Sequence, residues 1–146
     1  MLVNITGVLP LGKWKLIVFR SLFSRKPELS GAPATRRMKS YSSGSGYAYQ
    51  YCYEGQRALG AAGWEFVFSV SADRTHWRRT SVVLGDAATA EWRERHGREL
   101  SSTERYAVAK MALFQAFDER TPERMKDEVR VRAADVEAIA ETLGLE

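Results

Sequence analysis

The segment Ser101–Glu119, SSTERYAVAKMALFQAFDE, constrains the fold more than any other part of the chain. Ser101 and Glu104 have the spacing of a capping box, in which each side chain satisfies a backbone amide at the start of a helix. From Tyr106 to Phe117 the residues are apolar on almost every side of the expected helix. A helix with this pattern is usually buried among other elements. We therefore expect a central helix here, with the rest of the chain packed around it.

Alternating patterns ahead of this helix predict a sheet. Residues 47–54 place four tyrosines on one face and Ala, Gln, Cys and Glu on the other, and a period of two with many aromatic residues is typical of a strand. Residues 64–71 and 77–84 follow as further strands, and the short connections between them favour an antiparallel meander. The alternating segment 128–132 predicts a fourth strand at one edge, with its valines facing inward.

Two more helices and a turn are expected after these strands. Asp86 is a suitable N-cap for a helix over 87–96 that Gly97 would end. A proline begins a short turn over 122–126, and an apolar stripe predicts a last helix over 134–143. The element order is then βββ-αα-β-α. This order predicts an α+β fold in which an antiparallel meander of three to four strands carries its helices on one face, around a central buried helix.

Charge divides the chain at about residue 40. Residues 1–40 carry eight Lys or Arg and one acid, Glu28, whereas the whole chain of 146 residues has a net charge of only +4. Residues 41–146 are therefore net acidic, which argues against a domain that binds polyanions in general. We predict a basic, weakly structured extension over 1–40, either a targeting segment or the product of an over-long start, and a single α+β domain over 41–146.

The apolar run Trp14–Phe19 allows three interpretations of the extension. It is far shorter than the roughly 20 apolar residues that a transmembrane helix needs. An amphipathic helix over 14–23 would contact a membrane surface, a basic segment over 1–37 would direct import into an organelle, and a poorly folded extension ahead of Met38 would do neither. We favour the last interpretation and expect a cytoplasmic protein, since the single cysteine, Cys52, allows no intrachain disulfide.

Little in the sequence points to catalysis. It contains no zinc-ligand spacing, phosphate-binding loop, dinucleotide fingerprint or nucleophile elbow. His76 is expected in a turn and His96 at a helix end, and Cys52 is expected to be a buried, inert thiol. We therefore predict no catalytic residue, no metal site and no cofactor, and favour a binding domain over an enzyme. The alternative is a small enzyme with a pocket between sheet and helices that uses His96 or Cys52.

The tyrosine-rich strand is the candidate binding surface. Aromatic and arginine side chains are enriched where proteins meet, so we predict binding to a protein partner, or to a second copy of the chain, through an aromatic strand surface. The tyrosines could instead pack under the helices with their hydroxyl groups reaching water, and the sequence leaves both arrangements open. The predicted binding residues are Tyr47, Tyr49, Tyr51, Tyr53, Trp77 and Arg79.

A second binding function is compatible with the same residues. The tyrosines together with Arg57, Arg74 and Arg79 could bind single-stranded nucleic acid, because bases stack on aromatic rings. The segment Ser45–Tyr49 resembles part of the aromatic RNP1 motif of RNA-recognition domains. In that family the motif lies on the third strand, whereas here the strand comes first. Nucleic-acid binding is therefore kept as an alternative to protein binding.

Overall fold

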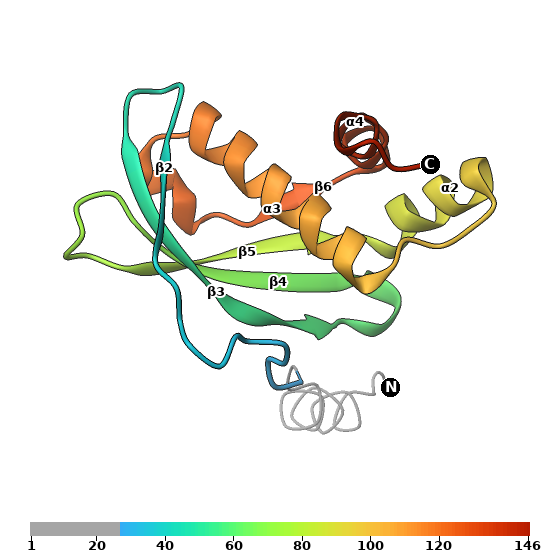
Figure 1. Cartoon of the computed structure of the whole chain (residues 1–146), viewed down its shortest axis with the longest axis horizontal. Helices are drawn as coiled ribbons and strands as arrows, with labels where there is room; N and C mark the ends of the chain where they lie inside the picture. The colour runs from blue at the N-terminus through green and yellow to red at the C-terminus, as the bar shows by residue number, and fades with distance from the viewer. Residues whose placement is uncertain (1–26) are drawn as a thin grey trace, which may run out of the picture.

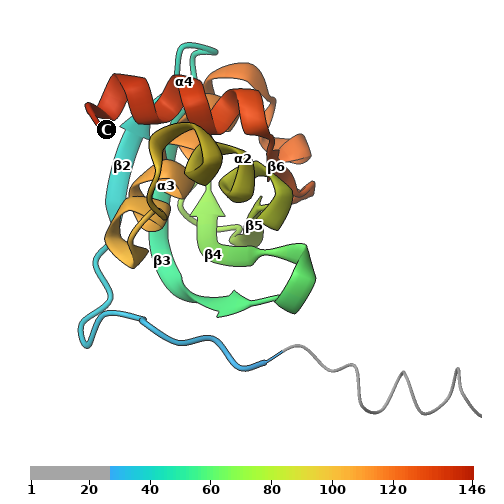
Figure 2. The same ribbon diagram turned by 90° about the vertical axis from the view of Figure 1, so that its right-hand side faces the viewer.

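The computed structural model describes residues 27–146, which form a curled five-stranded sheet around a long helix, α3 (Figures 1 and 2). The strands β2 to β5 form an antiparallel meander, and β6 pairs with β5 in parallel. The predictions for residues 14–23, and for most of 1–37, fall outside the described residues. The strands are Lys39–Ser42 (β2), Ala48–Ala58 (β3), Trp64–Ser71 (β4), Arg78–Leu84 (β5) and Val129–Val131 (β6).

Three helices pack on one face of this sheet in the described part of the chain (Figures 1 and 2). We call the sheet face that carries them the inner face and the opposite one the outer face. Within residues 27–146, no helix combines the length and the apolar character needed to cross a membrane. The helices are Asp86–His96 (α2), Ser102–Glu119 (α3) and Ala133–Leu143 (α4), and two short 3-10 turns cover Gly60–Ala62 and Pro122–Lys126.

The α+β class is confirmed, but the expected sheet of three to four antiparallel strands is wrong in two respects. The observed sheet has a fifth strand, β2, and its last two strands, β5 and β6, pair in parallel. The sequence of β2 shows no alternating apolar pattern, because Tyr41 is its only apolar residue. The strand β6 is parallel to β5 because the chain between them makes a long crossover through α2 and α3, as parallel neighbours require.

The central helix begins as expected and is less enclosed than expected. The Ser101 hydroxyl accepts the Glu104 N–H at 3.2 Å, and the Glu104 carboxylate accepts the Ser101 N–H at 2.8 Å, which completes the capping box. Leu113 and Phe117 are fully buried, whereas Gln115 is exposed. The helix therefore buries one side against the sheet and leaves another accessible. The start of α2 also differs, since Gly85 and not Asp86 occupies the N-cap position.

Aromatic stacking joins the sheet to α3 in the core. The ring of Tyr49 in β3 lies parallel to the ring of Phe117, with centroids 4.2 Å apart. Phe66 and Phe68 of β4 are fully buried in the same cluster, as is Trp92 of α2, with 1% of its surface exposed. Burial of large aromatic side chains contributes most to the stability of a core of this kind. The core therefore fills the space between the inner face and the helices.

A β-bulge at Glu54 and Gly55 interrupts the register between β3 and β4. Gly55 has φ +132°, and a Cβ atom there would lie 2.8 Å from the carbonyl oxygen of Ser30, so only glycine fits without strain. Beside the bulge, Ser30 and Gln56 exchange two backbone hydrogen bonds of 2.8 Å. These contacts hold residues 27–38, which we call the strap, along the edge of the sheet ahead of β2.

Candidate binding site on the outer face of the sheet

The tyrosines predicted to form a binding surface mostly belong to the core. Tyr49 is 0% exposed and Tyr51 is 5% exposed. Tyr53 is half-buried, and this burial is the main reason why the pKa of its hydroxyl group is raised to about 12. Only Tyr47, which precedes β3, keeps an exposed ring. The rings of Tyr49 and Tyr51 therefore lie under α3, where neither a protein partner nor a nucleic-acid base could stack on them, and the ring of Tyr53 is only partly accessible.

A pocket of about 390 Å³ opens instead on the outer face, where the side chains alternate with the buried tyrosines. It is lined by Arg36, Met38, Cys52, Ser69 and Trp77. Cys52 and Ser69 are cross-strand partners in β3 and β4 and form its floor. Met38 precedes β2 on one side of these strands, and Trp77 precedes β5 on the other. Met38 is 61% exposed and Trp77 39% exposed, so the two side chains form accessible walls.

The register of the sheet brings these residues together. Ser69 pairs with Cys52 in β3 and with Arg79 in β5. Met38 directly precedes β2, whose first residue pairs with the residue just before Cys52 in the sequence. Met38, Cys52, Ser69 and Arg79 therefore lie in one row across the outer face. At roughly 4.8 Å between neighbouring strands, the row is about 14 Å long. Of the predicted binding residues, Trp77 and Arg79 lie at this site.

A partly buried carboxylate, that of Glu54, bonds to both the floor and one wall of the pocket. Glu54 Oε2 accepts a hydrogen bond of 2.5 Å from the Ser69 hydroxyl and forms an ion pair with Arg36. Burial acts to raise the pKa of Glu54, but the bond from Ser69 and the charge of Arg36 outweigh it, and the pKa is lowered. Burial also raises the pKa of the Cys52 thiol, despite the opposing charge of Arg36. The thiol therefore stays protonated at neutral pH. Through its ion pair with Glu54, Arg36 also joins the strap to the sheet.

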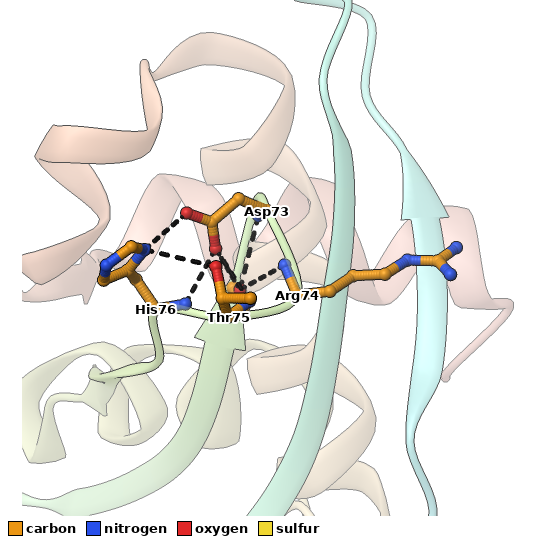
Figure 3. A network of polar contacts seen from close by, with 5 residues as sticks. Asp73, Arg74, Thr75 and His76 are labelled. Carbon is orange, nitrogen blue, oxygen red and sulfur yellow. Dashed lines mark hydrogen bonds and ion pairs between the residues drawn. The ribbon is translucent and has the colours of Figure 1, made fainter.

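The loop that carries Trp77 is fixed by the carboxylate of Asp73 (Figure 3). Asp73 Oδ1 accepts the N–H groups of Thr75 at 2.9 Å and of His76 at 2.8 Å, while Oδ2 lies 2.7 Å from His76 Nδ1. The hydroxyl of Ser71 donates to Oδ1 at 3.1 Å. The hydrogen bonds from His76 are the main cause of a pKa for Asp73 well below its ordinary value. Because His76 directly precedes Trp77, this network fixes where Trp77 leaves the loop.

Two exposed arginines, Arg37 and Arg79, lie beside the pocket and carry charge that no ion pair compensates in the described part of the chain. Among residues 27–146, no carboxylate forms an ion pair with Arg37, Arg74 or Arg79. Arg37 is adjacent to Met38, and Arg79 ends the row described above. Figure 3 shows the Arg74 side chain pointing away from the Asp73 carboxylate. The rim of the pocket is therefore positively charged, although residues 41–146 as a whole are net acidic.

The residues of the alternative functions do not come together. His96 lies on α2, with Nε2 3.0 Å from Glu137 of α4, whereas Cys52 lies on the outer face of the sheet. The two are therefore on opposite sides of the sheet, and Cys52 does not face the space between the sheet and the helices. Arg57 lies 3.1 Å from the carboxylate of Glu65 and is already paired. In the part of the chain that the structure describes, no group of three His, Cys, Asp or Glu side chains could hold a metal ion.

Several residues of the pocket carry no signal in the sequence. Arg36 and Met38 fall in the segment expected to be a weakly structured extension, and Ser69 is an ordinary polar position on the outer face of a strand. Met38 and Ser69 become informative only through the cross-strand register that aligns them with Cys52. Arg36 does so only through its hydrogen bond of 3.5 Å to the Cys52 sulfur. Trp77 and Arg79 are the residues of this site that the sequence already indicated as candidates.

Comparisons of the chain with models of protein families, with curated proteins and with solved structures found no match.

Proposed function

We propose that this protein is a non-catalytic binding domain that captures a segment of a partner protein in the outer-face pocket. The observation that carries the proposal is that Met38 and Trp77, two large apolar side chains that remain exposed, line the same pocket. Single exposed apolar side chains are normal on protein surfaces. Two that flank a hollow with a floor of small side chains are typical of a contact site.

The side chains of the pocket suit an apolar residue of the partner. Tryptophan is enriched among the residues that dominate binding energy, and methionine adapts its shape to irregular surfaces. The Asp73 network holds the backbone ahead of Trp77 before any partner arrives. A wall that is already ordered lowers the entropic cost of binding. The arrangement therefore favours insertion of one large apolar side chain between Met38 and Trp77.

The chemistry of the pocket supports binding over catalysis. Glu54 already accepts hydrogen bonds from Ser69 and Arg36, so it offers no free base. The Cys52 thiol has a raised pKa and is 6% exposed, and a thiol needs a lowered pKa to act as a nucleophile. Neither group is prepared to transfer a proton or to form a covalent bond.

Selection from a displayed library of random peptides, with the full-length protein as bait, tests the proposal. We expect the enriched peptides to lose about tenfold in affinity, or about 1.4 kcal/mol, with Trp77→Ala and with Met38→Ser. Leu143→Ala is the matched control, because Leu143 is also an exposed apolar side chain, 36% exposed, but lies on α4. Peptides that bind Trp77→Ala as well as the unmodified protein would show that the pocket is not the binding site.

A further inference from the structure

We infer that the segment captured by this pocket is acidic, with one large apolar residue flanked by Asp or Glu. This inference rests on the proposed function and specifies the chemistry of the partner. It follows from the charges around the pocket, since Met38 and Trp77 select only for an apolar side chain. The charged groups divide into one that is already neutralised and two that are not.

The neutralised group is Arg36, because its guanidinium forms an ion pair with the partly buried carboxylate of Glu54. The other two, Arg37 and Arg79, are exposed and pair with no carboxylate among residues 27–146. The carboxylate that is hydrogen-bonded to the floor, Glu54, is thus already paired within the protein, while the rim keeps its positive charge. Complementary charge at a rim speeds association and excludes partners of like charge.

The geometry places the free charges within reach of one short segment. The row from Met38 to Arg79 is about 14 Å long, and an extended chain advances roughly 3.3 Å per residue, so four or five residues span it. An apolar side chain inserted at the centre would place flanking residues near Arg79 on one side and Arg37 on the other. Arginine binds carboxylates with two parallel hydrogen bonds, which favours Asp or Glu at these positions.

The same charges argue against the basic end of this chain as the occupant. Residues 1–26 contain five Lys or Arg and no acid. Docking that segment at a rim of unpaired arginines would bring like charges together, which is unfavourable. A separate acidic partner is therefore the occupant that the charges favour.

Three synthetic peptides and the full-length protein test the inference. The first has one Leu flanked on each side by two Glu, the second has Lys in place of Glu, and the third has Ser in place of Leu. Fluorescence anisotropy with labelled peptides measures the affinities. We expect the acidic Leu peptide to bind at least about tenfold more tightly than the other two, and to weaken severalfold when NaCl is raised from about 20 to about 200 mM.

Two substitutions that each remove one positive charge show where on the protein the acidic peptide binds. Arg79→Gln should weaken binding of the acidic peptide severalfold, whereas Arg95→Gln on α2 should leave it unchanged, because Arg95 lies on the helical side of the molecule. If the acidic and basic peptides bind equally and both depend on Trp77, the inference falls and the proposed function stands. Failure of the acidic peptide to bind also overturns the inference, while the library selection judges the pocket independently. Binding of the acidic peptide that ignores Trp77→Ala contradicts both.

Discussion

The ring of Tyr49 lies parallel to the ring of Phe117, with centroids 4.2 Å apart and 13° between their planes. This stack joins β3 to α3, and both rings are 0% exposed. Its neighbour Tyr47, two residues earlier in the sequence, is exposed. The same residue type thus contributes to the core at one position and to the surface at the other, which gives a matched pair for measuring what the core position contributes.

Tyr49→Ala should lower the free energy of unfolding by about 3–5 kcal/mol, because it leaves a large cavity beside Phe117. Tyr47→Ala should change it by no more than about 0.5 kcal/mol, as is usual for exposed positions. Urea unfolding followed by circular dichroism measures both values. Equal effects of the two substitutions would contradict the assignment of Tyr49 to the core.

Gly55→Ala should destabilise the protein through the bulge in β3. The added Cβ would lie 2.8 Å from the Ser30 carbonyl oxygen at a φ of +132°, and strained backbone of this kind costs about 1–3 kcal/mol. Gly44→Ala is the control, since its Cβ would meet Asp118 at an ordinary 3.6 Å. Thermal unfolding compares the variants. A Gly55→Ala protein as stable as Gly44→Ala would mean that the strap does not approach the bulge.

The start of α3 should make stability depend on pH. The pKa of Glu104 is lowered from 4.5 to about 2, mainly because its carboxylate accepts hydrogen bonds of 2.8 and 3.0 Å from Arg98. Because the folded state has the lower pKa, this stabilisation is complete above the unfolded value and is lost as the pH falls toward 2.

The urea midpoint should therefore fall more steeply between about pH 5 and pH 2.5 in the unmodified protein than in Glu104→Gln. Glu141→Gln, which changes an exposed residue of α4, should keep the steep dependence. If Glu104→Gln and the unmodified protein gave parallel profiles, the pairing of Arg98 with Glu104 would not contribute to folding.

The Cys52 thiol should react slowly with an aromatic disulfide reagent at about pH 8, because burial raises its pKa and removes it from solvent. The chain unfolded in urea should react faster by at least about tenfold, since its thiol regains an ordinary pKa. Absorbance of the released thiolate follows both rates, and the single cysteine makes the assignment unambiguous. Equal rates in the two states would show that the floor of the pocket is open.

Asp73→Ala should weaken the binding of selected peptides more than it lowers stability. The substitution removes the carboxylate that accepts the Thr75 and His76 N–H groups and so fixes the loop ahead of Trp77. Peptide binding must then pay the entropic cost of ordering that loop. Hydrogen exchange of residues 72–77 should become faster, while α3 keeps its protection. Unchanged exchange in the loop would mean that the network does not hold it in place.

The sequence predicts local structure well wherever one pattern dominates. The capping box at Ser101 and the glycine stops at Gly97 and Gly144 are local chemistry, and the structure confirms all three. Alternation in β3 correctly places the tyrosines on one face. The full length of β3, to Ala58, is hidden because the bulge shifts the alternation after Glu54.

The pocket could not be predicted, because it depends on register between distant segments. Met38 and Cys52 are brought together by the pairing of β2 with β3, and β2 itself has too few apolar residues to be recognised. Whether a face of β3 is covered also depends on where α3 crosses, and no local pattern encodes this. The candidate site is therefore a pocket on the outer face of β3, and the expected tyrosine surface lies on the inner face of the same strand.

The parallel pairing of β6 with β5 has a consequence for how the chain reaches its native state. Residues 85–128 separate the two strands, so the last ladder closes only after both intervening helices have been synthesised and docked. Contacts between such distant segments slow folding, because a large loop must be ordered before any bond forms. A nascent chain that stops before Val129 would leave β5 with an unsatisfied edge, which is a template for aggregation until Val129–Val131 emerge from the ribosome.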